Sequence, residues 1–314
     1  MSKSGHSVVG VDNFSDYYSP EFKRLRIEEL FSGQDIQVVS CDLENRSLVT
    51  KLFNTHKFDG VIHFAAQAGV RLKTEENFRY VSSNLEGFVN TISETVLHKI
   101  PTFLYASSSS VYGDFSKIPY SESEKNLLPN SFYGATKLCN EVITPTIIKN
   151  SNTAARGVRL FTVYGPWGRP DMAYFRISAS AVSDVPFTLF GNGEIERDFT
   201  YIDDVVNCCI KLNTELAKRN IGYSDVVNIG GGKPIAMNIV LQKIMQLSNK
   251  TFNYKIMNGD KNDVAKTTAD NTYLKSLIGD YVFTDFDAGI SETLKWAKSD
   301  KIQSNLKNWI ESVK

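Results

Sequence analysis

Short apolar runs alternate with amphipathic stretches over the first half of the chain. An apolar run of a few residues is typical of a strand buried in a parallel sheet, and apolar residues recurring every three or four positions indicate a helix. The runs that predict strands are 6–13, 37–43, 59–66, 102–106 and 155–161. The stretches that predict helices are 21–30, 46–53 and 76–97. This alternation predicts an α/β fold with a doubly wound parallel sheet.

From residue 162 onward this alternation ends and the sequence pattern becomes typical of loops. Further elements are expected as a strand at 187–190, a helix at 205–212 capped by Asp203, a late strand at 226–230 that returns to the sheet, and helices at 237–247, 271–277 and 290–297. The sequence shows no internal repeat, and no low-complexity linker separates the region before residue 162 from the region after it. We therefore expect a second, smaller lobe (162–200 and 231–314) interleaved with a first (1–161 and 201–230).

One predicted helix start carries candidate chemistry. Tyr133 and Lys137 lie four positions apart, just after Asn130 and Ser131, either of which could cap the helix. Residues at this spacing share one helix face. An ammonium favours the ionised form of a nearby phenol, so the pair could exchange protons near neutral pH. Many surface helices carry the same spacing by chance.

The strand upstream makes this pair more significant. It ends in four serines, 107–110, at the edge of the sheet where α/β proteins place their active sites. A structural alternative exists for each serine, because serines at a strand end also cap backbone groups.

Composition narrows the function classes. Lys+Arg and Asp+Glu both number 35 among the 314 residues, so no general attraction to nucleic acid or to an anionic membrane is implied. The longest apolar runs, such as 58–66, are too short to span a membrane, and no secretory signal follows Met1. We expect a cytoplasmic protein with no membrane or nucleic-acid partner.

Cysteine and histidine spacing predicts no metal site. Cys41, Cys139, Cys208 and Cys209 form no Cys-x-x-Cys motif, and adjacent Cys208 and Cys209 suit an amphipathic helix. His63 lies inside a predicted strand, where packing in the core is the expected role. These residues favour a reducing compartment and a protein without disulfides.

Six segments together resemble a known family. They are 11–18, 65–71, 107–113, 133–137, 161–172 and 197–204, and they occur in the family's order over nearly the whole chain. The chain resembles the extended short-chain dehydrogenase/reductases, and within them the nucleotide-sugar epimerases, most closely the UDP-glucuronate 4-epimerases. The resemblance implies a Rossmann-like NAD-binding first lobe, a nucleotide-sugar-binding second lobe, and a homodimer joined by a four-helix contact.

The chain departs from this family at its start. Family members open with a strand, a Gly-x-x-Gly-x-x-Gly turn and a helix whose N-terminal amides hold the cofactor pyrophosphate. Residues 1–6 match the tail of that helix, so roughly 20–25 residues of the family's ~30-residue unit are absent. The absent strand is central in the usual order, which predicts a sheet split in two. The intact later motifs favour a mis-assigned start over a degenerate protein.

The resemblance also implies catalytic and cofactor-binding roles. Tyr133 would exchange a proton with the sugar 4-hydroxyl, Lys137 would stabilise the phenolate and hold the nicotinamide ribose, and Ser108 would hydrogen-bond the 4-oxygen. The expected NAD-binding residues are Asp12, Asn13, Asp42, Leu43, Phe64, Ala65, Ala66, Asn84, Tyr133 and Lys137.

The positions after Ser108 separate the expected reaction from related ones. Sugar 4,6-dehydratases carry an Asp-Glu pair there and UDP-glucuronate decarboxylases a Glu, whereas this chain has Ser109 and Ser110. This difference favours simple C4 epimerisation, from UDP-glucuronate to UDP-galacturonate. Epimerisation of another sugar, such as UDP-glucose or UDP-N-acetylglucosamine, and a non-catalytic nucleotide-binding remnant remain alternatives.

The remaining family positions predict substrate contacts. A guanidinium suits a carboxylate through paired hydrogen bonds, so Arg169 with Thr162 is expected to bind the sugar acid, and Arg71 is a further candidate. The alternatives are a solvent-exposed loop arginine for Arg169 and a phosphate or backbone contact for Arg71. Ser109 and Ser110 would lie near the sugar. The positions expected to hold the uridine diphosphate are Phe187, Phe190, Arg197 and Asp263.

Overall fold

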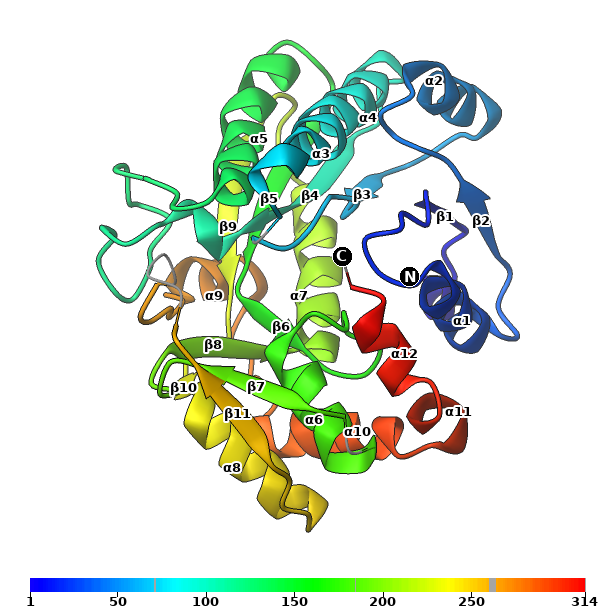
Figure 1. Cartoon of the computed structure of the whole chain (residues 1–314). Helices are drawn as coiled ribbons and strands as arrows, with labels where there is room; N and C mark the ends of the chain where they lie inside the picture. The colour runs from blue at the N-terminus through cyan, green and yellow to red at the C-terminus, as the bar shows by residue number, and fades with distance from the viewer. Residues whose placement is uncertain (71, 184, 260–263, 314) are drawn as a thin grey trace.

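Four parallel strands form the main sheet of the computed structural model, which describes residues 1–70, 72–183, 185–259 and 264–313 (Figure 1). The order is β3 (Val61–His63), β4 (Thr102–Ser108), β5 (Ala154–Leu160) and β9 (Ser224–Ile229). Helices α2 (Arg46–Thr55), α4 (Gly87–Leu97) and α5 (Phe132–Ile148) pack on one side of it, and α7 (Ile202–Leu216) and α9 (Thr272–Ile278) on the other. The predicted α/β, doubly wound parallel sheet is confirmed.

The sheet is split, as the sequence predicts. Strand β1 (Val8–Asp12) pairs in parallel with β2 (Ile36–Ser40), and these two form a sheet of their own. Within the described residues, no ladder joins β1 to β3. Ile62 in β3 and Phe64 just after it are consequently 38% and 45% exposed, although both are apolar.

Beyond the main sheet, the part of the chain predicted to form a second lobe contains two small sheets and several helices. Its sheets have the orders β10-β8-β6 and β11-β7. The strands are β6 (Thr162–Tyr164), β7 (Phe187–Phe190), β8 (Glu196–Tyr201), β10 (Pro234–Ala236) and β11 (Tyr254–Met257). The helices are α6 (Ala173–Ser183), α8 (Met237–Ser248) and α10 (Phe286–Ala297), and they enclose the largest apolar core of the chain.

Three details of the helices differ from the sequence prediction. The long helix predicted at 76–97 is interrupted: a short α3 (Phe78–Tyr80) and a π-helical turn (Val81–Glu86) precede α4. Helix α7 begins at Ile202 with Tyr201 as its N-cap, so Asp203 lies in its first turn and does not cap it. Helix α6 was not predicted, because nearly all of its residues are buried and no polar face marks its period.

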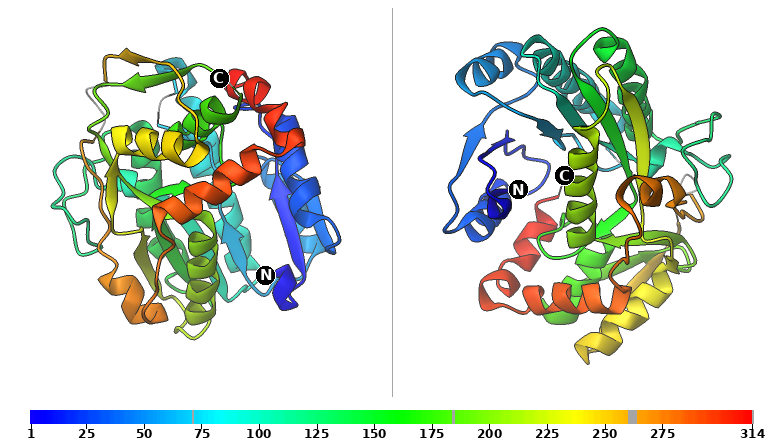
Figure 2. Two further views of the ribbon diagram at one scale, coloured as in Figure 1. Left: turned by 90° about the horizontal axis from the view of Figure 1, so that it is seen from below. Right: turned by 180° about the vertical axis from the view of Figure 1, so that it is seen from behind.

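The first long helix and the last helices of the chain lie side by side. The short helices α11 (Asp300–Gln303) and α12 (Leu306–Glu311) lie beside α1 (Pro20–Phe31) (Figure 2). The Phe22 ring of α1 stacks on Trp309 of α12, with centroids 4.3 Å apart, and on Trp167 at 5.7 Å. This aromatic stack holds the β1–β2 unit to the second lobe.

Two core assignments made from the sequence are confirmed. His63 is buried between the rings of Phe88 and Phe103, and Cys208 and Cys209 are buried on the inner side of α7. Among the helices that the structure describes, none combines the length and the apolar character needed to cross a membrane.

Candidate active site

The start of α5 is anchored against the end of β4. Ser131 is the N-cap, and its hydroxyl accepts a hydrogen bond from the Gly134 amide at 3.0 Å. A Cβ on Gly134 would lie 2.6 Å from the Ser110 carbonyl oxygen, so only glycine allows the helix this close to the serine turn. The approach brings Tyr133 within hydrogen-bonding reach of Ser108, the last residue of β4.

Lys137 lies buried one helical turn after Tyr133. Its Nζ donates a hydrogen bond to the Ala106 carbonyl at 2.9 Å and stands 5.8 Å from the centroid of the Tyr133 ring. Burial of the ammonium lowers the pKa of Lys137 to about 8.

The Tyr133 phenol does not have the low pKa that its spacing from Lys137 suggested. Burial raises the pKa of Tyr133, and the Arg169 charge and a hydrogen bond with Ser108 only partly oppose that rise. Desolvation of the phenolate outweighs the cations nearby. The resting phenol is therefore protonated at neutral pH.

Arg169 lies close enough to act on Tyr133, and it has a partner of its own. Its Nε and Nη2 donate to Asp171 Oδ1 and Oδ2 at 3.0 and 2.8 Å. The Tyr17 hydroxyl donates to the same Oδ2 at 3.2 Å. Burial raises the pKa of Tyr17 above its usual range, and the Asp171 carboxylate adds to this, so Tyr17 remains a donor.

The residues predicted to bind NAD follow the carboxyl ends of successive strands. Asp12 ends β1, and its Oδ1 accepts from the Phe14 amide at 2.7 Å; Asn13 accepts from the Ser15 amide at 2.9 Å. Asp42 and Leu43 follow β2, and Phe64, Ala65 and Ala66 follow β3. Each of these residues thus lies at or just after the carboxyl end of its strand, which is where parallel sheets bind dinucleotides.

Asn84 is held differently from the other candidates. It is buried in the π-helical turn, where its Oδ1 accepts from the Gln67 amide at 2.8 Å and its Nδ2 donates to Gln67 O and Thr136 Oγ1, both at 3.1 Å. These contacts use both of its amide hydrogens to brace the turn after β3 against α5. π-helical turns are frequent at functional sites.

The predicted substrate residues are spread over both lobes. Ser109 and Ser110 form a 3₁₀ turn after Ser108, and Thr162 begins β6. Arg197 in β8 donates to Val264 O at 2.6 Å, and Phe190 ends β7 half-exposed. Phe187 packs inside the core of the second lobe, so its side chain is not presented to a ligand. Arg71 and Asp263 lie outside the described residues.

Comparison with known proteins identifies the family. Residues 1–230 match the NAD-dependent epimerase/dehydratase family. The chain belongs to this family. UDP-glucuronate 4-epimerase 1 of Arabidopsis thaliana is 38% identical over 311 residues, covering 94% of this chain and 72% of the relative.

Solved structures of related proteins agree with this family assignment and with the fold. UDP-glucuronic acid 4-epimerase from Bacillus cereus, in complex with UDP-glucuronic acid and NAD, is 30% identical with a TM-score of 0.82, over 94% of this chain and 92% of that one. MoeE5 in complex with UDP-glucose and NAD is 25% identical with a TM-score of 0.79, over 93% and 98%. The fold and family expected from the sequence are confirmed.

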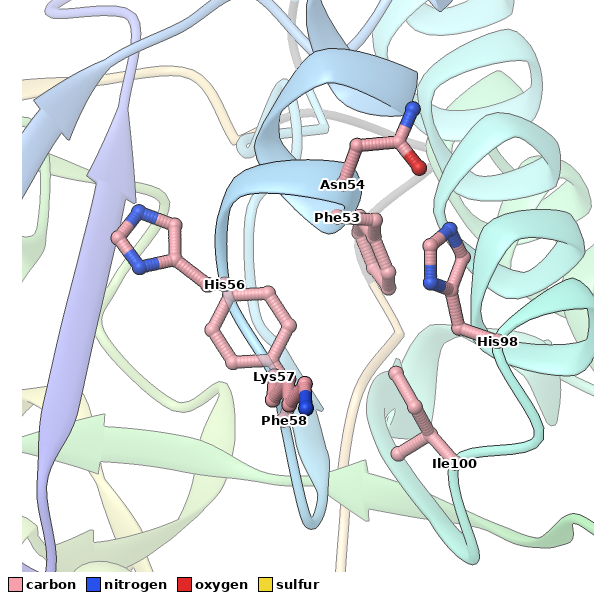
Figure 3. A pocket seen from close by; sticks show the side chains of 7 residues that line it. All are labelled: Phe53, Asn54, His56, Lys57, Phe58, His98 and Ile100. Atoms are coloured by element: carbon pink, nitrogen blue, oxygen red, sulfur yellow. The ribbon is translucent and has the colours of Figure 1, made fainter.

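A pocket of about 420 Å³ lies elsewhere in this epimerase/dehydratase fold. It is lined by Phe53, Asn54, His56, Lys57, Phe58, His98 and Ile100. The Phe53 and His98 rings are neighbours in this pocket (Figure 3). Their centroids are 5.8 Å apart. Ile100 precedes the start of β4 whereas Ser108 ends it, so this pocket is at the opposite edge of the sheet from Tyr133.

Sequence reasoning missed two residues of the site. Asp171 and Tyr17 both lie inside segments that carried the family resemblance, yet neither received a role. The Arg-x-Asp spacing at 169–171 was an available signal, since an acid two positions from an arginine in a loop can pair with it. Tyr17 is separated from Asp171 by 154 positions, and no local pattern joins them.

Proposed function

We propose that this protein interconverts UDP-glucuronate and UDP-galacturonate by NAD-dependent epimerisation at the sugar C4. The observation that carries the proposal is the arrangement of Tyr133, Lys137 and Ser108, which brings a phenol, an ammonium and a hydroxyl together at the carboxyl edge of a parallel sheet. The named relatives that are UDP-glucuronate 4-epimerases support the choice of reaction.

The residues present fit two parts of NAD. Lys137, a buried ammonium with hydrogens beyond the one given to Ala106, fits the nicotinamide ribose, and Asp12 at the tip of β1 fits the adenosine ribose. The residues after β3 offer an apolar surface for the flat rings of NAD. They are Phe64, Ala65 and Ala66. The 314-residue sequence has no Gly-x-x-Gly-x-x-Gly turn for the pyrophosphate. When bound, NAD supplies the acceptor and donor for the C4 hydride.

The chain's own residues perform the proton transfer. The resting phenol is protonated, so the reaction starts from the fraction of Tyr133 that has released its proton to solvent. This phenolate takes the proton of the sugar 4-hydroxyl at its Oη and later returns it to the new 4-oxygen, so Tyr133 ends the turnover in the form in which it began. Ser108 hydrogen-bonds that oxygen and the phenol, and Lys137 stabilises the phenolate. Ser109 and Ser110 hold the sugar without an acidic group that could drive elimination, so the 4-keto sugar is reduced again rather than dehydrated.

Residues of both lobes position the substrate. Thr162 and Arg169 hold the sugar carboxylate, while Phe190 and Arg197 hold the uridine diphosphate. We assign residues 1–161 and 201–230 to NAD binding and the rest to the nucleotide sugar. A homodimer through α4 and α5 is part of this proposal, since these helices leave Leu97 and Val142 67% and 62% exposed. Light scattering of the purified protein tests it, and a monomeric mass would contradict it.

The activity is tested by incubating the purified chain with NAD and UDP-glucuronate and resolving the sugars by NMR. UDP-galacturonate should form until the two sugars reach equilibrium. The Tyr133→Phe variant serves as the blank. Absence of any UDP-galacturonate at substrate and NAD concentrations in the millimolar range would overturn the proposal.

UDP-glucose is the second candidate substrate. The observation that favours it is the pairing of Arg169 with Asp171, which already neutralises the guanidinium expected to select a carboxylate. Supplying UDP-glucose in the same assay and finding faster turnover than with UDP-glucuronate would decide for it.

A further inference from the structure

Asp171 occupies one edge of the Arg169 guanidinium. A guanidinium has more than one edge at which paired N–H groups can bind a carboxylate. Asp171 takes the Nε–Nη2 edge with contacts of 3.0 and 2.8 Å. Nη2 also donates to Met172 Sδ at 3.7 Å, whereas no hydrogen bond from Nη1 occurs within residues 1–70, 72–183, 185–259 and 264–313. Nη1 therefore has no hydrogen-bond acceptor among the residues that the structure describes.

The Asp171 carboxylate is fixed in place from a second direction. Tyr17 donates to its Oδ2, and the Tyr17 hydroxyl is confined by Gly69, on which a Cβ would lie 2.7 Å away. The loop that carries Arg169 is also constrained: a Cβ on Gly168 would overlap the Tyr174 hydroxyl. The Arg169–Asp171 pair is thus held by residues from three segments of the chain.

Arg169 lies near the phenol at which the reaction is proposed. Arg169 lies close enough to Tyr133 for its charge to lower the pKa of that phenol. In a hexose, C5 joins C4 to C6, so a group that faces the C4 oxygen has the C6 substituent beside it. The C6 substituent is a carboxylate in UDP-glucuronate and a hydroxymethyl group in UDP-glucose.

We propose that Asp171 is a specificity-determining residue that balances the charge of Arg169 and so limits how strongly the site prefers a sugar carboxylate over a neutral C6 group. This proposal rests on the proposed function. Carboxylates on two edges of one guanidinium are about 6 Å apart, and Coulomb's law then predicts that their repulsion weakens binding by about three- to a hundredfold. A neutral C6 group escapes this repulsion.

The test measures equilibrium binding of UDP-glucuronate and of UDP-glucose, each in the presence of NAD, by calorimetry. All variants are made in the Tyr133→Phe background, which cannot turn the sugars over, and the Tyr133→Phe protein with Asp171 intact is the wild-type reference for position 171. The Asp171→Asn variant keeps the shape of the side chain and one acceptor for Arg169 but removes the charge. We expect it to bind UDP-glucuronate roughly tenfold more tightly than the wild type, with the affinity for UDP-glucose changed less than about threefold. The matched control is Tyr17→Phe, which removes a hydrogen bond to Asp171 without changing any charge and should leave the ratio of the two affinities unchanged.

Several outcomes would overturn the proposal. If Asp171→Asn weakens the binding of both nucleotide sugars by the same factor, Asp171 has a structural role only. Any other result that leaves the ratio of the two affinities unchanged leads to the same conclusion. A similar rise in the ratio for Tyr17→Phe would show that geometry rather than charge is responsible. Binding is measured without turnover, so a protein that binds as predicted but forms no C4 epimer would contradict the proposed function and not this inference. If Asp171→Asn does not fold, Asp171→Ser takes its place with the same expected direction.

Discussion

Buried ionisable side chains at the site act against the stability of the fold. The Lys137 ammonium is buried and the Tyr133 phenol is partly buried, and this burial shifts the pKa of each toward its neutral form. Neither shift stabilises the charged form, so the fold alone gives no reason for this pair. A proton-transfer role accounts for their position, because such a group must reach the reacting oxygen and exchange its proton there.

Replacing Tyr133 by Phe removes the proton carrier and keeps the ring. We expect formation of the C4 epimer to fall at least about 100-fold, the low end for loss of a general acid–base group. Thermal stability should be unchanged or slightly higher, because a buried hydroxyl is removed. Tyr254→Phe on β11, a half-exposed tyrosine of the second lobe, is the control and should retain full activity. Activity within tenfold of the wild type in Tyr133→Phe would contradict the assignment.

The burial of His63 predicts that the protein loses stability as the pH becomes acidic. Burial, followed by the charge of Lys137, lowers the pKa of His63 to about 3, well below the ordinary value of 6.5. The unfolded chain then binds a proton that the folded chain excludes, so stability is retained above pH 6.5 and lost as the pH falls toward 3. From pH 6.5 to 5 the loss is about 2 kcal/mol.

Urea unfolding of the wild type and of His63→Leu at several pH values checks this expectation. The variant keeps an apolar side chain between Phe88 and Phe103, and it removes the titrating group. Between pH 6.5 and 5, the unfolding free energy of the wild type should fall by about 2 kcal/mol relative to that of the variant. Parallel pH profiles for the two proteins would rule out His63 as the source.

At the scale of single elements, the cap of α5 links folding to activity. Ser131 holds the first turn, and Tyr133 lies two residues further on. Ser131→Ala should lower the free energy of unfolding by about 1 kcal/mol, the usual effect of losing a cap, and should also lower kcat by loosening Tyr133. Chemical denaturation and the epimerase assay measure the two effects.

The chain contains a matched control for this variant. Ser19 caps α1 in the same way, accepting from the Phe22 amide at 3.2 Å, and α1 carries none of the proposed catalytic residues. Ser19→Ala should therefore reduce stability by a similar amount and leave kcat unchanged. An equal loss of kcat in both variants would mean that general destabilisation, rather than the position of Tyr133, controls the rate.

Elements marked by a continuous apolar run, a 3.6-residue period or turn residues were predictable, and those without such a mark were not. The strands β4 and β5 and the start of α5 follow directly from apolar runs and turn residues. Helix α6 has apolar or small side chains buried on nearly every side, so its period is hidden. The π-helical turn at Val81–Glu86 depends on a change of hydrogen-bond register, which apolar spacing does not record.

The candidate site was likewise predictable only where a local sequence pattern locates its residues. Tyr133, Lys137 and Ser108 could be placed together because a helix spacing and a strand end locate them. The direction of the Tyr133 pKa could not be predicted, since it depends on how deeply the fold buries the phenol. The link from Tyr17 through Asp171 to Arg169 joins the loop after β1 to the loop before α6, and only the tertiary structure brings these together.

At the scale of the whole molecule, the β1–β2 unit is attached by side chains rather than by a continuous sheet. Its apolar face packs on α2 through Val9, Val11 and Val39, and α1 joins it to the second lobe through Phe22. Because β1 has no ladder to β3 among the described residues, these contacts replace the backbone hydrogen bonds that join strands elsewhere in the fold. The residues predicted to hold the adenosine of NAD therefore depend on distant packing.

Trp309 is the side chain whose loss should show this dependence. It is 4% exposed and stacks on Phe22, so Trp309→Ala should lower the free energy of unfolding by about 3–5 kcal/mol. Amide exchange should accelerate first in β1 and α1, and NAD affinity should fall with it, while β4 and β5 keep their protection. Phe115→Ala is the control, since that ring is 80% exposed and its loss should change stability by less than about 0.5 kcal/mol. Uniform acceleration of exchange across β1, β4 and β5 would instead mean that the two sheets unfold as one cooperative unit despite the missing ladder.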